Sequence, residues 1–485
     1  MKSHIYLTLI SAFLFFSLQA DAKEEKVPFL KEKQAAVASI EDHQKDLIQL
    51  SDQIWQFAET ALLETKSSKV LADYAEQKGF KVERGVAGMP TAFIATYGEG
   101  KPVIGIMGEY DALPGISQKA TSVKEPLEPG AAGHGCGHNL FGAASLGAAI
   151  AIKEQIESGK LKGTIRFYGT PAEENYGGKA YMLREGMFKD LDVCLAWHPS
   201  TETGSDTESS QAIVDFIVEF KGKASHAAAD PWNGRSAVDA LELYTHALNM
   251  MREHVKPTVR MHYVIQKAGD VPNVIPEYSK LWVWMRDSKR TGVEPLLERA
   301  RKIAAGVAMA TETESKFTIQ SGSYEMLVNF TGQKTLYKNL QWLGPLKFTE
   351  QEQQFAKEIQ KTTGVPEKGL NFNIEPFNDK PGEPEGGSTD VGDVSWVTPT
   401  VHLSVTTAPA DAPWHGWPVV ACGGMSIGHK GLVYAAKALA ATMVDFYLDP
   451  AQREKIRTEF AEKTKGTIYK GYIAEGPPPV PQDYK

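Results

Sequence analysis

Short apolar runs that alternate with helical patterns are the feature that most constrains the fold of this 485-residue chain. Four runs bounded by turn-forming residues predict buried strands, at residues 91–97, 103–108, 164–169 and 192–197. Helical spacing of apolar residues predicts helices within residues 34–78, at 140–156 and at 432–448. Strands that alternate with helices favour an α/β fold, in which a largely parallel sheet is covered by helices.

The middle of the chain follows a different pattern. It predicts a strand-helix-strand-strand-helix-strand order, with its clearest elements at residues 212–220, 236–254, 262–268, 279–286 and 293–311. This order is typical of a ferredoxin-like sandwich. Because a single compact domain rarely exceeds about 250–300 residues, we expect a second domain at 212–322, inserted into a split catalytic domain at 23–211 and 323–485.

The N-terminus has the pattern of an export signal. Lys2 precedes an apolar run at residues 5–18, and Ala20-Asp21-Ala22 offers small residues to a signal peptidase. The run is shorter than the ~20 residues that span a membrane. We therefore expect cleavage after residue 22 and a periplasmic or secreted protein. No later stretch is expected to span a membrane, so no membrane association is expected after cleavage.

Charge and cysteine content exclude two classes of protein. The chain has 52 Lys and Arg against 60 Asp and Glu, a formal charge of −8, and this argues against a nucleic-acid partner. Three cysteines are too few for a disulfide framework. A free cysteine kept in an oxidising compartment is notable, and metal ligation is one way to protect it.

The segment Gly133-His-Gly-Cys136-Gly-His138-Asn139 has the strongest chemical pattern. A thiolate and an imidazole suit a metal such as zinc, and the glycines give the backbone freedom to bring them together. Taken alone, the pair fits a buried cysteine beside a capping histidine equally well.

Further polar residues follow the predicted strands, as active-site residues of open α/β sheets do. Each alone also fits a surface or packing role. Together they offer enough ligands for two divalent metals that share a water, with Glu173 left over as a general base. The five predicted ligands are Cys136, His138, Glu174, His198 and His415.

Several segments resemble the M20 metallopeptidase family. They are Glu-Tyr-Asp-Ala-Leu-Pro at 109–114, Gly-Cys-Gly-His-Asn at 135–139, Pro-Ala-Glu-Glu at 171–174, Trp-His-Pro at 197–199 and Gly-Lys-Ala-Ser-His at 222–226. Within the family the chain resembles the amidohydrolase branch, which includes hippurate and auxin-conjugate hydrolases, and it is most similar to the aminobenzoyl-glutamate hydrolases. The resemblance covers residues 35–450. It implies a zinc-peptidase-like mixed sheet flanked by helices, with a ferredoxin-like dimerisation or lid domain.

The resemblance also implies roles for single residues. The five ligands match a dinuclear site for zinc or manganese, with the thiolate of Cys136 as the bridge, and Glu173 matches the catalytic base. Asp111 matches an aspartate that orients a metal-ligand histidine. Glu109 stands where many relatives carry that histidine, which leaves the role of Asp111 open.

The inserted domain supplies the remaining implied residues. His226 matches a histidine that reaches into the partner's active site in dimeric relatives and polarises the scissile carbonyl, so a homodimer through this domain is implied. Asn273 and Arg286 fall where relatives hold the substrate carboxylate, although Arg286 alternates with tryptophans and also fits a plain surface charge. Whether a second type of subunit is needed stays open.

The expected function is metal-dependent hydrolysis of N-acyl or N-aroyl amino acids, such as aminobenzoyl-glutamate, by a metal-activated water. One alternative is a dipeptidase or carboxypeptidase with the same site, although no acidic anchor for a substrate α-amine is evident in the sequence. The other is a non-catalytic relative that binds a metal or ligand, which would have no need of Glu173 as a base.

Overall fold

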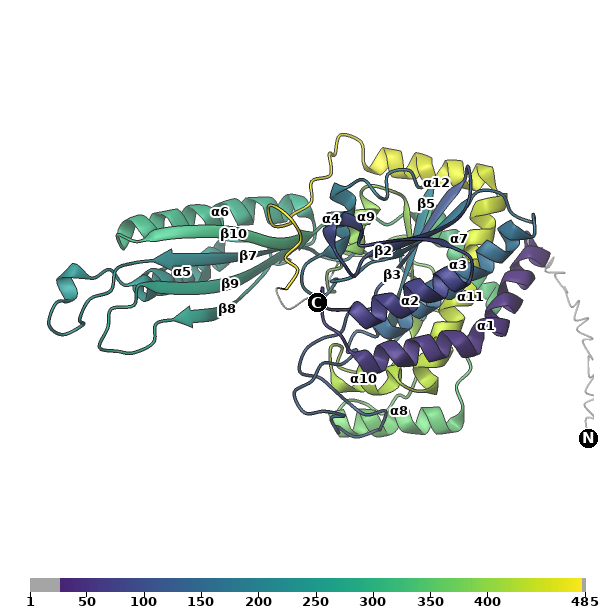
Figure 1. Ribbon diagram of the computed structural model, residues 1–485, viewed down its shortest axis with the longest axis horizontal. Helices are drawn as coiled ribbons and strands as arrows, with labels where there is room; N and C mark the ends of the chain where they lie inside the picture. The colour runs from purple at the N-terminus through teal and green to yellow at the C-terminus, as the bar shows by residue number, and fades with distance from the viewer. Residues whose placement is uncertain (1–26, 385, 482–485) are drawn as a thin grey trace, which may run out of the picture.

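The computed structural model describes residues 27–384 and 386–481, and the expected export signal at 1–22 lies outside them. The described elements form a seven-stranded and a four-stranded sheet (Figure 1). The larger sheet contains, in spatial order, β1 (Lys81–Arg84), β2 (Phe93–Gly98), β4 (Thr164–Gly169), β3 (Val103–Gly108), β5 (Val193–Ser200), β11 (Thr400–Thr406) and β6 (Gly204–Ser205).

The four central strands of the larger sheet, β4, β3, β5 and β11, are parallel, and antiparallel strands extend it at both edges. All four strands predicted in this part of the chain are present, and the mixed α/β fold is confirmed. Every residue of β3 is buried, because both faces of a largely parallel sheet are covered.

Helices surround the larger sheet. α3 and α11 lie against its strands, and α1 packs over both helices (Figure 1). The helices of this part are α1 (Leu30–Phe57), α2 (Thr65–Gln77), α3 (His138–Glu157), α4 (Gly178–Arg184), α7 (Phe330–Leu343), α8 (Glu350–Thr363), α9 (Val391–Ser395), α10 (Trp417–Gly423), α11 (Ser426–Leu448) and α12 (Pro450–Lys463), with a 3-10 turn at Val86–Gly88.

One expectation about apolar stretches was wrong. α11 is long and apolar enough to cross a membrane by length and composition. However, 83% of the most apolar stretch of this helix is buried within the protein, where the helix packs on α3 and α1. Core helices of water-soluble proteins pass the same test, so α11 has the placement of a core helix.

The four-stranded sheet extends away from the larger one (Figure 1). Its antiparallel strands lie in the order β10 (Glu314–Ser323), β7 (Ala212–Lys221), β9 (Tyr278–Asp287) and β8 (Arg260–Ala268). α5 (Ala237–Met251) and α6 (Arg290–Ala310) pack on one face, and 3-10 turns lie at Pro231–Asn233 and Arg252–His254. The chain order and strand order are those of the expected ferredoxin-like sandwich.

Burial alternates along β9 and distinguishes the two faces of the small sheet. Leu281, Val283 and Met285 are buried in the core with α5 and α6, whereas Trp282, Trp284 and Arg286 are half-buried. Because successive side chains of a strand point to opposite faces, the latter residues lie on the face that carries no helix. We call this the open face of the small sheet.

Candidate active site

Side chains from several strand ends of the larger sheet gather at one cavity of about 510 Å³. One wall combines residues that follow β4, a residue near the end of β5, the loop that leads into α3 and the loop before α10. These residues are Cys136, Glu173, Glu174, His198 and His415. The opposite wall is the open face of the small sheet, with Ile213, Asp215, Trp284 and Arg286. The cavity therefore lies between the two sheets.

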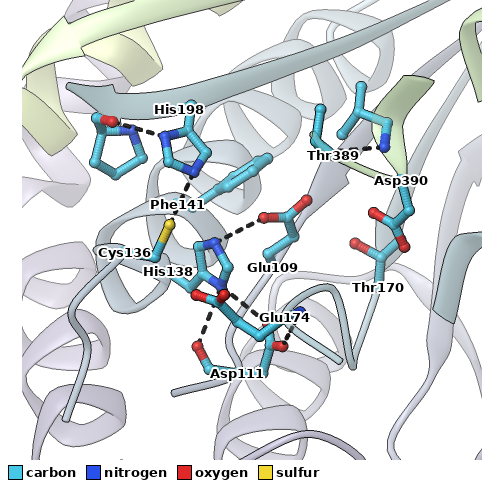
Figure 2. A network of polar contacts seen from close by, with 12 residues as sticks. Glu109, Asp111, Cys136, His138, Phe141, Thr170, Glu174, His198, Thr389 and Asp390 are labelled. Atoms are coloured by element: carbon cyan, nitrogen blue, oxygen red, sulfur yellow. Dashed lines mark hydrogen bonds and ion pairs between the residues drawn. The ribbon is translucent and has the colours of Figure 1, made fainter. Parts of the chain in front are cut away.

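All five predicted ligands come together there. Potential ligand atoms of Cys136, His138 and His198 lie within 4.8 Å of one another, and so do those of Cys136, Glu174 and His415. Cys136 Sγ is 3.3 Å from His198 Nε2 (Figure 2). These two groups share only Cys136. A third set, Glu109, His138 and Glu173, also has its potential ligand atoms within 4.8 Å of one another.

The chemistry of these residues fits divalent cations. Glu174 Oε1 is buried without a hydrogen-bond partner in the described part of the chain, and the buried His138 Nε2 lies 3.0 Å from Glu109 Oε2. Burial lowers the pKa of His198 to about 4 and also lowers the pKa of His415, which favours the neutral imidazole that binds a metal. Burial alone would lower the pKa of His138 as well, but the charges of Cys136 and Glu109 outweigh it and raise that pKa, so a metal would have to displace a proton there. Burial raises the pKa of Cys136 above its usual value, so its thiolate form needs a cation beside it.

Asp111 positions two of the ligands. Its Oδ1 lies 2.9 Å from His138 Nδ1, and its Oδ2 accepts a hydrogen bond from the Glu174 backbone N–H at 2.9 Å (Figure 2). A carboxylate on one ring nitrogen fixes the orientation of a histidine whose other nitrogen is free to bind a metal. This geometry favours a positioning role for Asp111, the point that the sequence left open.

Backbone geometry explains two of the glycines around Cys136. Gly137 has φ +78°, and a Cβ there would lie 2.9 Å from the side chain of Pro199. The carbonyl of Gly135 accepts a hydrogen bond from the His415 N–H at 3.1 Å, and a Cβ on Gly135 would lie 2.3 Å from Ile116. These close approaches hold the 133–139 loop against the residues after β5 and against the loop of His415.

Two loops of the site contain strained backbone. His415 has φ +56°, and Ala172, directly before the two glutamates, has φ +61°. Left-handed backbone is costly for residues with a side chain. The Ala172 N–H donates to Glu64 Oε1 at 2.9 Å, so a buried carboxylate helps to hold this loop in place. Burial, with the nearby charge of Asp111, raises the pKa of Glu64 to about 8.

A buried ion cluster, which the sequence did not predict, lies behind the site. Lys179 Nζ is 2.6 Å from Glu109 Oε1 and 2.5 Å from Asp390 Oδ1, and the three side chains are at most 3% exposed. Glu109 Oε2 in turn lies 3.0 Å from His138 Nε2 (Figure 2). In the sequence, Glu109 stood out only as the residue at the place where many relatives carry a histidine, and nothing pointed to Lys179.

Glu173 lies in the cavity wall among other acids. Its withdrawal from water raises its pKa well above the usual value, and the charges of Glu109, Glu174 and Asp390 act in the same direction. A carboxyl group that binds a proton this readily has the property of a general base.

The residues predicted to contact substrate separate into two places. Arg286 lines the cavity, its Nε has no hydrogen-bond partner among the described residues, and its Cζ lies 5.3 Å from the ring centre of Trp284. His226 and Asn273 lie together beyond the other end of the small sheet, where the Ala227 N–H donates to the Asn273 carbonyl at 3.0 Å. From Ile213 at the cavity to the far end of β7 is roughly 25 Å at ~3.3 Å per residue, so one chain does not bring His226 and Asn273 to its own cavity.

Comparisons with known proteins agree with this geometry. The sequence model of peptidase family M20/M25/M40 matches residues 105–404. The chain is 38% identical over 472 residues to the B subunit of p-aminobenzoyl-glutamate hydrolase from Escherichia coli (strain K12), a match that covers 91% of this chain and 98% of that protein. It is 31% identical over 440 residues to the Xaa-Arg dipeptidase of Mus musculus, covering 88% of this chain and 92% of that protein.

Solved structures support the fold. A dinuclear metal-binding M20 peptidase of Bacillus subtilis superposes with a TM-score of 0.57 at 19% identity, covering 84% of this chain and 100% of that one. An aminobenzoyl-glutamate utilization protein from Klebsiella pneumoniae gives 0.59 at 17% identity, covering 84% and 98%. The chain therefore belongs to peptidase family M20/M25/M40 and is a metal-dependent hydrolase of amide or peptide bonds.

Proposed function

We propose that this protein hydrolyses the amide bond of N-acyl or N-aroyl amino acids, with aminobenzoyl-glutamate as the model substrate. The observation that carries the proposal is the pair of candidate ligand groups that share Cys136. They lie in one cavity with Glu173 and with Arg286, whose Nε has no hydrogen-bond partner among the residues that the structure describes. The similarity to the hydrolase named for p-aminobenzoyl-glutamate supports this substrate class.

The proposed chemistry assigns one task to each group. Two divalent ions held by the five ligands would polarise the amide carbonyl and make water acidic enough to lose a proton near neutral pH. Glu173 takes that proton and delivers it to the leaving amine. Arg286 holds the substrate carboxylate, for which the fork of a guanidinium is well suited. We propose zinc or manganese as the metal, and the thiolate ligand favours zinc.

We propose that His226 acts in the site of a second copy of the chain. It is exposed, and its Nδ1 accepts backbone N–H bonds from Ala228 at 3.2 Å and Ala229 at 3.1 Å. The neutral ring therefore carries its proton on Nε2, which can donate to the oxygen that becomes negative in the transition state.

The edge of the small sheet supports a homodimer. β8 is an edge strand, and on it Val264 is 61% and Ile265 48% exposed. An exposed apolar edge strand offers unpaired backbone groups to another strand. Since p-aminobenzoyl-glutamate hydrolase has differently named A and B subunits, both of them relatives of this chain, a second type of subunit is the competing partner.

We also propose that residues 1–22 direct export and are then removed, which would place the mature protein in the periplasm or outside the cell. The support is the apolar run followed by Ala-Asp-Ala. N-terminal sequencing of the protein from a periplasmic fraction tests this, and an intact Met1 in that fraction contradicts it.

The direct test of the activity is Glu173→Gln. Metal content should stay at the wild-type level, because Glu173 is not among the five ligands, while turnover of N-acyl amino acids should be lost. A panel of N-acyl amino acids and dipeptides separates the alternatives. Cleavage of dipeptides alone indicates a dipeptidase, the activity for which the mouse relative is named. Bound metal without cleavage of any compound indicates a binding protein. Full activity of the Glu173→Gln variant would refute the assignment.

A mixing experiment tests the dimer. Glu173→Gln and His226→Ala should each be inactive alone. Mixed heterodimers contain one site with both an intact Glu173 and an intact partner His226. Complete exchange of equal amounts makes about half of the dimers mixed, so about a quarter of the wild-type rate should return. A mixture that exchanges protomers but stays inactive contradicts the proposed role of His226.

A further inference from the structure

Asp215 is a buried acid in the cavity that the proposed mechanism leaves unused. It lies on the open face of the small sheet, is 2% exposed, and lines the cavity that contains the ligand residues. No lysine, arginine or histidine in residues 27–384 and 386–481 forms an ion pair with it. Its hydrogen bonds come from Trp282 Nε1 and from Ser321 Oγ, the latter at 3.2 Å. Burial raises the pKa of Asp215 to about 7.

Asp215 and Arg286 face the same cavity without pairing. Asp215 lies opposite Trp284 in the β7–β9 register, and Arg286 lies two residues further along β9, so the two are diagonal neighbours about 7–8 Å apart. Arg286 Nε has no partner in the described chain. One wall thus presents a guanidinium beside an acid that accepts hydrogen bonds from the neighbouring protein but forms no ion pair within residues 27–384 and 386–481.

A second cavity continues from Asp215. It has a volume of about 420 Å³ and shares Asp215 and Asn175 with the first. Trp282 lines it, and the ring of Trp282 meets that of Trp284 edge-on, with centroids 5.8 Å apart. Asp215 therefore stands where the two cavities meet, next to a pair of indole rings.

We propose that Asp215, flanked by Trp282 and Trp284, is a specificity-determining residue that binds an amino group on the acyl half of the substrate. The inference rests on the proposed function, because it takes Arg286 as the site of the carboxylate. An amino group donates N–H bonds to the Asp215 carboxylate, and the indole rings suit either an aromatic amine by stacking or an aliphatic ammonium by cation–π contact. The shared chemistry is an N–H donor that the acyl group supplies.

Matched substrate pairs test the proposal. 4-Aminobenzoyl-glutamate is compared with benzoyl-glutamate, and alanyl-glutamate with propionyl-glutamate, so that each pair differs in one amino group. Wild-type protein should prefer the amine-bearing member of at least one pair, and that pair identifies an aromatic or an aliphatic amine. Asp215→Asn should lower kcat/KM for that member about 10- to 100-fold, the usual effect of losing a hydrogen bond to a charged group, with little change for its amine-free twin.

Glu219→Gln is the matched control. Glu219 lies four residues along the same face of β7, lines the second cavity and accepts a hydrogen bond from Tyr278 OH at 2.7 Å, so this variant removes the other carboxylate of that cavity while leaving Asp215 in place. It should keep the wild-type preference. A purely structural role for Asp215 predicts equal losses for both members of each pair, and that result, or a wild type without preference in either pair, overturns the proposal.

Binding separates this proposal from the proposed function. In a Glu173→Gln background, calorimetry measures the affinity of the same pairs without turnover. Tighter binding of the amine-bearing member, lost in the double variant Glu173→Gln/Asp215→Asn, supports the subsite. This holds even if wild-type protein cleaves none of the four compounds, because absence of cleavage would refute only the proposed activity. Equal affinities within both pairs overturn the subsite even if cleavage is observed.

Discussion

Lys179 offers the sharpest prediction about what holds the site together. Its ammonium group lies 2.6 Å from Glu109 and 2.5 Å from Asp390, and none of the three side chains is more than 3% exposed. Burial alone would lower the pKa of Lys179, but the charges of Asp390, Glu109 and Glu173 outweigh it and raise the pKa above its usual value. Lys179 is therefore charged, and it neutralises part of an acidic cluster.

Lys179→Met leaves Glu109 and Asp390 buried without a cation. Breaking a buried ion pair by removing one partner costs about 3–5 kcal/mol, a large share of the roughly 5–15 kcal/mol that stabilises a typical domain. Urea unfolding, followed by circular dichroism and tryptophan fluorescence, measures the loss. Adding Asp390→Asn should recover part of it, because the double variant has the same net charge in the cluster as the wild type.

Lys69→Met is the control for the loss of a lysine. Its partner Asp73 lies four residues along the same helix, and the two side chains are 70% and 47% exposed. Exposed pairs of this kind contribute about 0.3–0.5 kcal/mol. A loss of less than about 1 kcal/mol in Lys179→Met, close to that of Lys69→Met, would refute the view that the buried cluster needs its cation.

Two further predictions concern single residues. Cys136→Ser should lower the content of both metals, measured by elemental analysis of purified protein, because the two candidate groups that contain Cys136 share its sulfur. Cys194 is a buried cysteine of β5 outside these groups, so Cys194→Ala should keep its metal. Equal metal loss in the two variants contradicts a thiolate shared by both metals. Asp215→Asn should change how stability depends on pH. The folded pKa of about 7 lies above the usual 3.8, so the contribution of Asp215 to stability falls as pH rises from about 4 to 7 and then levels off. The melting temperature of the variant relative to wild type should therefore rise across that range, and a constant difference would show that Asp215 does not titrate there.

Burial patterns explain which parts of the fold the sequence predicted. Residues 103–108 and 164–169 were predicted to the residue as β3 and β4, because turn residues bound each run and the strands are buried on both faces. The helical pattern at 34–78 divides into α1 and α2, and the sequence did not show the break. Ala58 and Leu62 have positive φ angles there. Neither residue type indicates such a turn in a sequence, whereas a glycine would.

The predicted ligands were recognisable because each follows a buried strand or lies in a glycine-rich loop. Their supporting residues were not, because they pair across long stretches of chain. Lys179 and Asp390 are 211 residues apart in sequence, and Glu64 holds Ala172 across 108 residues. No local pattern encodes such a pairing, and the topology of the sheet alone brings these residues together.

The surroundings of Asp215 show that a strand pattern alone does not reveal whether a polar strand face is exposed to solvent or covered by a second domain. In residues 212–220 two acids four residues apart among apolar residues are typical of a strand with one face in solvent. Yet β7 is buried from Ala212 to Val218, because its open face near Asp215 covers the cavity instead of facing water. The sequence offered no acidic anchor for a substrate amine, and this weighed against substrates that carry one. Since Asp215 lies beside Arg286 on the wall opposite the ligands, that objection no longer holds, and an amino group on the acyl half is compatible with either an aroyl amino acid or a dipeptide.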